Sequence, residues 1–321
     1  MDEFYIDNCN KSIETQDQLS LVSRSIILSL LYFDIFSYPL TAEELESHSS
    51  SVNLPKGLLK RSLDDLKSKM FVQTHQDYFF LPNQKALVER RIIGNKKADE
   101  YILKARKISN FISYFPFVKG IFISGSVAKG YADKDSDIDY FIVTAPNRLW
   151  LSRTLLILFK KIFLLNSKKY FCLNYFIDTE HLEIPDKNIF TAVELSYLLP
   201  TYNEAIFRKI IQTNNWTKEY FPNFIQKTVP TISEKNNFIK RIIEKLLSGY
   251  IGNKLDDYCL SGTENFWNYK FRKNFEKNST SIRCKKYVSK FHPQNFQDKV
   301  LVKYEERISS YEQNYKIRLR P

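Results

Sequence analysis

The chain has 321 residues, of which 43% are hydrophobic and 26% are charged, so it is a globular sequence with room for two or three domains. Its formal net charge of +12 predicts a polyanionic partner, such as a nucleic acid or a nucleotide, or else a solvated basic surface. The amino terminus lacks the basic and apolar regions of a signal peptide, and the four scattered cysteines are not spaced as a zinc site. These features argue against a secreted, disulfide-stapled or zinc-dependent fold and predict a cytoplasmic protein with free thiols.

The amino-terminal end of the chain predicts a short tail followed by a helical domain. Residues 1–20 are polar and aperiodic, and we expect a tail there. The first domain is expected over residues 21–84, where residues 23–36 are apolar almost all round, as in a buried helix. Thr41 and Glu44 form a capping-box pattern, which predicts that a second short helix begins there.

A third helix and a hairpin complete this predicted domain. The helix is expected to begin near Asn53 and Pro55, because apolar residues then recur at helical spacing: Leu59, Leu63, Leu66 and Met70. Residues 71–81 contain two short apolar runs around a polar turn, which predicts a β-hairpin. Three helices and a hairpin in about 60 residues resemble a winged helix.

The third helix of a winged helix commonly lies in the DNA major groove. Four basic residues of this predicted helix could serve that purpose: Lys56, Lys60, Arg61 and Lys67. Asp64 and Asp65 lie on the same helix and would face phosphate, which argues against DNA contact. Winged helices also serve as protein-contact modules, so both interpretations stay open.

The most informative motif lies between residues 119 and 144. Residues 121–123 have the length and composition of a buried strand, and the strand leads into a Gly125-Ser126 turn. After ten further residues, Asp137 and Asp139 open a second apolar run. Because side chains alternate along a strand, the two carboxylates should point the same way and offer oxygen ligands to a divalent cation.

This motif resembles the nucleotidyltransferase superfamily that includes DNA polymerase beta and the minimal nucleotidyltransferases. The resemblance implies that Gly125 and Ser126 hold the triphosphate of an NTP. It also implies that Asp137 and Asp139 hold Mg²⁺ or Mn²⁺. Lys129 lies in the spacer within plausible reach of phosphate, although a solvated lysine is the simpler interpretation.

Active members of the superfamily usually carry a third carboxylate on a third strand, which we expect over residues 170–177. Asn174 occupies the matching position, and its neutral amide cannot accept a proton as a base would. Asp178 has the same strand parity but lies four residues further on, and it would reach the site only if the chain bent back. We expect the nucleotidyltransferase domain to cover residues 85–188.

The remaining residues, 189–321, are expected to form a helical and basic domain. Thr191 and Glu194 form another capping-box pattern. Residues 231–321 contain 19 lysine or arginine residues and 10 acidic residues, and eight of the basic residues lie between Lys270 and Lys290. That basic stretch is a candidate surface for nucleic acid, with a solubilising face as the alternative. We expect no membrane partner, because the longest apolar run, residues 149–165, contains three basic residues.

The sequence therefore predicts an α+β protein with an amino-terminal winged helix, a central mixed sheet with flanking helices and a carboxy-terminal helical region. Two functions remain open. The first is a magnesium-dependent nucleotidyltransferase that moves a nucleoside monophosphate from an NTP to a hydroxyl or phosphate acceptor. The second is a catalytically silent NTP-binding sensor, or a DNA-binding regulator, that uses the winged helix as its output.

Overall fold

The computed structural model describes residues 19–50, 57–82, 84–167, 169–227, 229–233, 237–271, 281–291 and 295–320. Most of the predicted tail, the expected start of the third helix at Asn53 and Pro55, and the stretch 272–280 of the basic region lie outside the described residues. Within them, the fold is α+β, with a mixed sheet and flanking helices, as the sequence predicts.

The amino-terminal helices and hairpin form as expected and gain one extra strand. The elements are α1 (Leu21–Asp34), β1 (Leu40–Thr41), α2 (Ala42–Ser47), α3 (Leu58–Ser68), β2 (Gln73–His75) and β3 (Tyr78–Phe80). The three strands form a small antiparallel sheet in the order β1-β3-β2. The predicted capping box is confirmed, because the Thr41 hydroxyl accepts from the Glu44 amide while the Glu44 carboxylate accepts from the Thr41 amide.

The second sheet has six strands in the order β7-β4-β5-β6-β9-β8. Their bounds are β4 (Val118–Ser124), β5 (Asp139–Thr144), β6 (Cys172–Asp178), β7 (Leu199–Tyr202), β8 (Ile282–Lys285) and β9 (Val288–Phe291). Only β5 and β6 run parallel, and all other neighbours are antiparallel. The region 189–321, which we expected to be helical, therefore also supplies three strands of this sheet. Pro200 is tolerated in β7 because that strand lies at the sheet edge.

Helices cover both faces of the six-stranded sheet. The helices that follow the amino-terminal group are α4 (Ala86–Ile112), α5 (Gly125–Ala128), α6 (Leu149–Phe163), α7 (Ile189–Ser196), α8 (Glu204–Thr213), the 3₁₀ turn η1 (Asn215–Glu219), α9 (Phe238–Leu246), α10 (Tyr250–Lys270) and α11 (Phe296–Tyr315). On one face, α4, α6 and α10 pack against a core that contains Ile121, Tyr140 and Ile142. On the other face, α7, α8 and α11 pack against Phe122 and Phe141.

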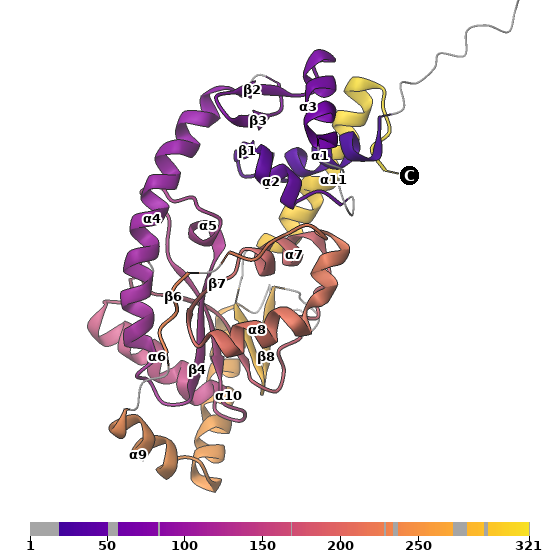
Figure 1. Cartoon of the computed structure of the whole chain (residues 1–321). Helices are drawn as coiled ribbons and strands as arrows, with labels where there is room; N and C mark the ends of the chain where they lie inside the picture. The colour runs from indigo at the N-terminus through magenta and orange to yellow at the C-terminus, as the bar shows by residue number, and fades with distance from the viewer. Residues whose placement is uncertain are drawn as a thin grey trace, which may run out of the picture.

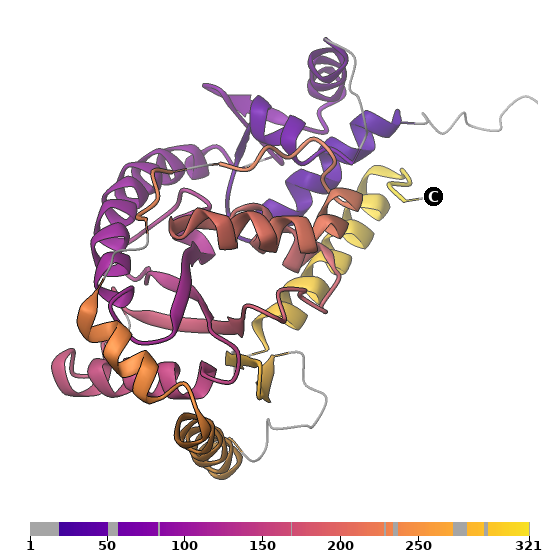
Figure 2. The same cartoon turned by 60° about the horizontal axis from the view of Figure 1, so that its bottom comes forward.

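The long helix α4 connects the amino-terminal group to the sheet, while α11 returns from the carboxy-terminal end to lie beside α1 (Figures 1 and 2). The Tyr304 hydroxyl of α11 donates to the Leu28 carbonyl of α1, and Arg307 pairs with Asp34. One continuous apolar core contains residues of α1, α3, α7, α11 and the sheet. The two ends of the chain thus share a core on the same face of the sheet.

Candidate active site

The turn that follows β4 brings the backbone of Gly125 close to the carboxylate of Asp139. Gly125 has φ of +73°, in the left-handed region that favours glycine, and it begins the short helix α5. A Cβ atom at this position would lie 2.4 Å from Oδ2 of Asp139 on the neighbouring strand. Ser124 pairs with Asp139 across the sheet, so the turn and the carboxylate are held together by strand register.

The two predicted carboxylates lie together at the start of β5. Asp137, Asp139 and Cys172 each offer one potential ligand atom for a metal, and these three atoms lie within 4.8 Å of one another. Ile138 between the two aspartates is fully buried, and its amide and carbonyl bond to the chain that leads into β6. The buried isoleucine therefore directs both carboxylates to the same side, as the strand alternation predicts.

The electrostatics of this group favour a bound cation. Burial, together with the neighbouring Asp137 carboxylate, raises the pKa of Asp139 from 3.8 to about 7. Burial and the two aspartates also raise the pKa of the Cys172 thiol, so at neutral pH this side chain is a thiol and not a thiolate. Two carboxylates form a donor set for a hard divalent cation, whose charge would offset their repulsion.

Asn174 lies in this site, but not through the simple alternation that the sequence suggested. Tyr140 pairs with Leu173 and Phe141 pairs with Tyr175, so Asn174 is the extra residue of a β-bulge. The bulge turns its side chain toward β5, where Nδ2 donates to Oδ1 of Asp139 over 2.5 Å. The Cys172 thiol donates to Oδ1 of the same amide over 3.3 Å.

The same bulge removes Asp178 from the candidate site. Because one extra residue reverses the alternation, Phe176 packs into the core on the α4 side of the sheet, and Ile177 packs on the opposite side. Asp178 lies at the far end of β6, opposite Thr144, and accepts hydrogen bonds from the amides of Glu180 and His181. The expectation that Asp178 shares a face with Asn174 is wrong, and its carboxylate caps a local turn.

Lys129 lies beside the Gly125 turn and is held there by a residue that the sequence reasoning missed. Its Nζ is 2.6 Å from Oε1 of Glu194 on α7 and 3.3 Å from the Gly125 carbonyl. The predicted capping box at Thr191 is wrong, because α7 begins earlier and Asn188 caps it. Glu194 instead points toward the aspartates and contributes to the raised pKa of Asp139.

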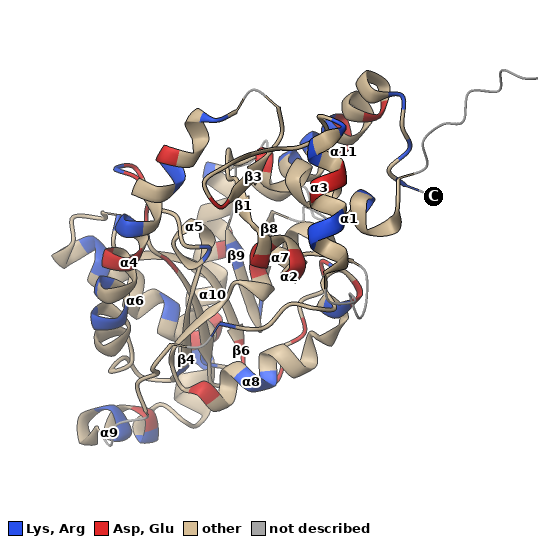
Figure 3. Ribbon diagram, turned by 45° about the horizontal axis from the view of Figure 1, so that its top comes forward, with Lys and Arg blue, Asp and Glu red and all other residues tan. Residues whose placement is uncertain are grey.

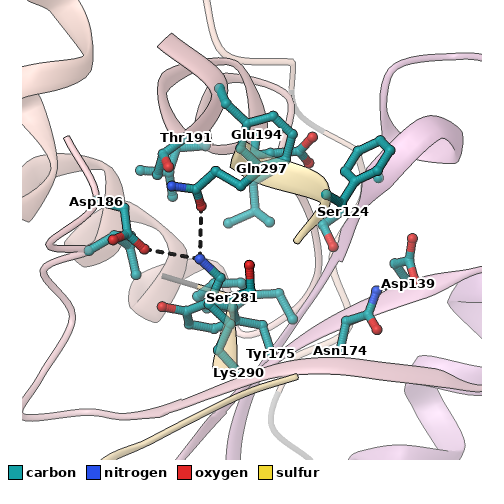
Figure 4. Close-up of a pocket in the computed structure, with 17 residues that line it drawn as sticks. Ser124, Asp139, Asn174, Tyr175, Asp186, Thr191, Glu194, Ser281, Lys290 and Gln297 are labelled. Carbon is teal, nitrogen blue, oxygen red and sulfur yellow. Dashed lines mark hydrogen bonds and ion pairs between the residues drawn. The ribbon is translucent and has the colours of Figure 1, made fainter. Parts of the chain in front are cut away.

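A cavity of about 210 Å³ opens beside Asp139 (Figure 4). Its wall is mostly apolar and comes from the sheet, α7 and α11: Phe141, Tyr175, Ile184, Phe190, Leu195, Leu198 and Phe296. At the end of the cavity away from Asp139, the Lys290 ammonium donates to the Asp186 carboxylate over 3.0 Å and to the Gln297 side-chain oxygen over 2.9 Å. Ser126, by contrast, is exposed beside the turn and does not line the cavity.

The cavity also changes the interpretation of the basic stretch 270–290. Lys290 is buried at the cavity, Arg283 pairs with Asp186, and Lys286 pairs with Asp256 over 2.8 Å. These three cations balance carboxylates inside the protein and do not form an open surface. Within the described part of this stretch, Lys270 and Lys285 are the exposed basic residues, so nucleic-acid binding there stays a prediction.

The Gly125-Ser126 turn and the paired aspartates lie within a stretch of the chain that matches a known protein family. Residues 104–245 match the family described as the nucleotidyltransferase domain, a stretch that runs from α4 through the candidate site to α9. The match supports nucleotidyl transfer in general and implies an NTP substrate. No curated protein and no solved structure matched the chain. Among the described helices, none has the length and apolar character needed to cross a membrane.

Proposed function

We propose that the protein is a metal-dependent nucleotidyltransferase that transfers a nucleoside monophosphate from an NTP to an acceptor. Asp137 and Asp139 would hold Mg²⁺, or Mn²⁺, and the Gly125-Ser126 turn would hold the triphosphate. The observation that carries the proposal is the close approach of the Gly125 turn to the Asp139 carboxylate, with Asp137 beside it: a Cβ at Gly125 would lie 2.4 Å from Oδ2 of Asp139. This arrangement would bring phosphate and metal to one point.

In this reaction the bond between the α-phosphorus and the pyrophosphate oxygen breaks, and a bond from the acceptor oxygen to that phosphorus forms. Pyrophosphate leaves, and the acceptor proton passes to a base. A bound divalent cation would supply charge neutralisation on the phosphates. Lys129 would contribute a further positive charge, because Glu194 holds its ammonium group next to the Gly125 carbonyl.

We place the acceptor in the cavity beside Asp139. The cavity volume of about 210 Å³ and its apolar wall suit a small molecule better than a polymer. At its far end, Arg283 and the buried Lys290 share the single carboxylate of Asp186, so this end would favour a polar or anionic group of that molecule. A hydroxyl or phosphate of the acceptor would then face the aspartates.

A second function is favoured by Asn174, whose amide occupies the place of a third carboxylate. Within the described residues, the group around Asp137 and Asp139 has a thiol as its third member, not a third acid. The protein would then bind an NTP without turning it over, and the winged-helix domain proposed for residues 21–84 would transmit the bound state. The exposed side of α3 carries acids as well as bases, with Lys69 3.3 Å from Asp65, which favours a protein over DNA as that domain's partner (Figure 3).

The two functions are separated by following the nucleotide. The full chain is incubated with each α-labelled NTP, with Mg²⁺ or Mn²⁺ and with a pool of small hydroxyl and phosphate compounds. Enzymatic function predicts pyrophosphate release and a labelled product, both lost in Asp139→Asn but retained in Asp135→Asn, an exposed control in the preceding loop. NTP binding in calorimetry without any product would support the silent sensor instead.

A further inference from the structure

Helix α9 is amphipathic, but its apolar side faces solvent. Phe238, Ile239 and Leu246 are 74%, 68% and 70% exposed, and Ile242 between them is 41% exposed. These four positions fall on one side of the helix at a spacing of 3.6 residues per turn. A helix that covers a core would turn this side inward.

The polar side of α9 fixes this orientation. The Lys240 ammonium is buried and donates to the carbonyls of Ser113 and Val118, each over 2.9 Å. The Glu244 carboxylate accepts from the Phe117 amide over 2.6 Å and lies 3.6 Å from the Lys119 ammonium. Because buried charges are costly to leave unpaired, these contacts hold the apolar side outward.

The first turns of α10, which follow α9 directly in the chain, also carry exposed apolar residues. Tyr250, Ile251 and Tyr258 are 73%, 65% and 78% exposed. Arg148 binds the junction between the two helices by donating to the carbonyls of Leu247 and Ser248 over 2.7 and 2.5 Å. The junction is therefore held in place, and it lies at the end of the molecule opposite α1–α3 (Figure 1).

The exposed charges around this surface are mostly positive. Arg241, Lys245 and Lys254 are exposed on the two helices. Of the acids in the same segments, Glu244 contacts Lys119 and Asp256 is buried. Asp257 is exposed and lies 2.5 Å from Lys286. The surface therefore combines large apolar side chains with unbalanced positive charge.

We propose that the α9–α10 surface, defined by the exposed residues of 238–258, docks on an anionic lipid bilayer. Peripheral binding to an anionic membrane requires two features: exposed apolar side chains on a helix, and lysine or arginine residues beside them. This surface has both. A second copy of the chain is a poorer occupant, because a symmetric contact would bring the three cations of each copy together. The inference revises the sequence-based expectation of no membrane partner and does not depend on the proposed reaction.

The test is flotation of the full chain with vesicles of phosphatidylcholine alone or mixed with phosphatidylglycerol. The chain should float with the mixed vesicles and not with phosphatidylcholine alone, and about 0.5 M salt should weaken the binding by screening. Replacing Arg241 and Lys245 with glutamine should reduce the affinity by roughly 30-fold. The triple variant Phe238→Ser, Ile242→Ser, Leu246→Ser should no longer float.

A control variant replaces three apolar residues elsewhere that are at least 61% exposed, Ile93→Ser, Leu103→Ser and Ile225→Ser. This control should float like the parent, and circular dichroism should show that all variants are folded. Equal flotation of the α9 triple variant would overturn the proposal. The proposal would also be overturned if the parent does not float but is a dimer in analytical ultracentrifugation, while the α9 triple variant is a monomer. The occupant of the surface would then be a second copy of the chain.

Discussion

Replacing Asp139 with asparagine should stabilise the metal-free protein at high pH. The Asp139 carboxylate lies in a buried position beside Asp137, and this environment raises its pKa to about 7. Asparagine has nearly the same shape and keeps the oxygen that accepts from Asn174. The substitution therefore removes a charge that the fold disfavours and leaves the hydrogen bond in place.

The magnitude follows from the difference between the folded and unfolded pKa values of Asp139. The pKa rises from 3.8 to about 7, and each pH unit corresponds to 1.36 kcal/mol, so the charged form costs at most about 4 kcal/mol of unfolding free energy. Between pH 3.8 and pH 7 the folded state binds more protons at Asp139 than the unfolded state does. The free energy of unfolding of the parent is therefore highest below pH 3.8 and falls as the pH rises toward 7. Above pH 7 the full penalty applies to the parent and not to the variant.

Urea unfolding of the metal-free parent and Asp139→Asn at pH 4 and pH 8 measures this effect. The variant should gain up to about 4 kcal/mol over the parent between the two pH values, and Asp135→Asn should gain none. Adding Mg²⁺ at pH 8 should stabilise the parent and leave Asp139→Asn unchanged. A variant that is no more stable than the parent at pH 8 would refute the view that the carboxylate is held at an energetic cost.

Three further substitutions probe the site from different sides. Gly125→Ala places a side chain at a positive-φ position and against the Asp139 carboxylate, so it should lower the free energy of unfolding in urea by about 1–3 kcal/mol and abolish stabilisation by metal. Unchanged metal binding would contradict the close approach of Gly125 and Asp139. Asn174→Asp adds a carboxylate at the bulge and should raise the rate of nucleotidyl transfer, by up to roughly 10²–10⁴-fold if the carboxylate acts as a base. An unchanged rate would show that residue 174 does not limit catalysis. Glu194→Gln removes the carboxylate that holds the Lys129 ammonium beside the Gly125 turn and should weaken NTP binding up to about fivefold in calorimetry. Tighter binding would mean that Glu194 competes with the triphosphate for the lysine.

Much of the site could be predicted because its signals are local in sequence. The Gly-Ser turn requires a residue without Cβ, and the buried Ile138 between two aspartates fixes their common direction. The amino-terminal helices could be predicted for the same reason, since the capping box at Thr41 acts within four residues.

The rest depended on contacts that no local pattern reports. The bulge at Asn174 is set by pairing with β5, and it reverses the face on which Asp178 lies. Glu194 matched a capping pattern, although its role is decided by Lys129, 65 residues away. The strands β8 and β9 are four residues each and lie between helices, so only their place in the sheet identifies them.

Pyrophosphate release from NTPs shows whether the protein transfers nucleotides. The full chain is incubated with each of the four NTPs, the small-molecule acceptor pool and Mg²⁺ or Mn²⁺, with Asp137→Asn and Asp139→Asn run in parallel. We predict release of pyrophosphate that requires the metal and is lost in both variants, together with a product that carries the nucleoside monophosphate. A parent that bound an NTP with metal but released no pyrophosphate with any acceptor would contradict nucleotidyl transfer. Variants that both released pyrophosphate as fast as the parent would contradict the assignment of Asp137 and Asp139 as the metal site.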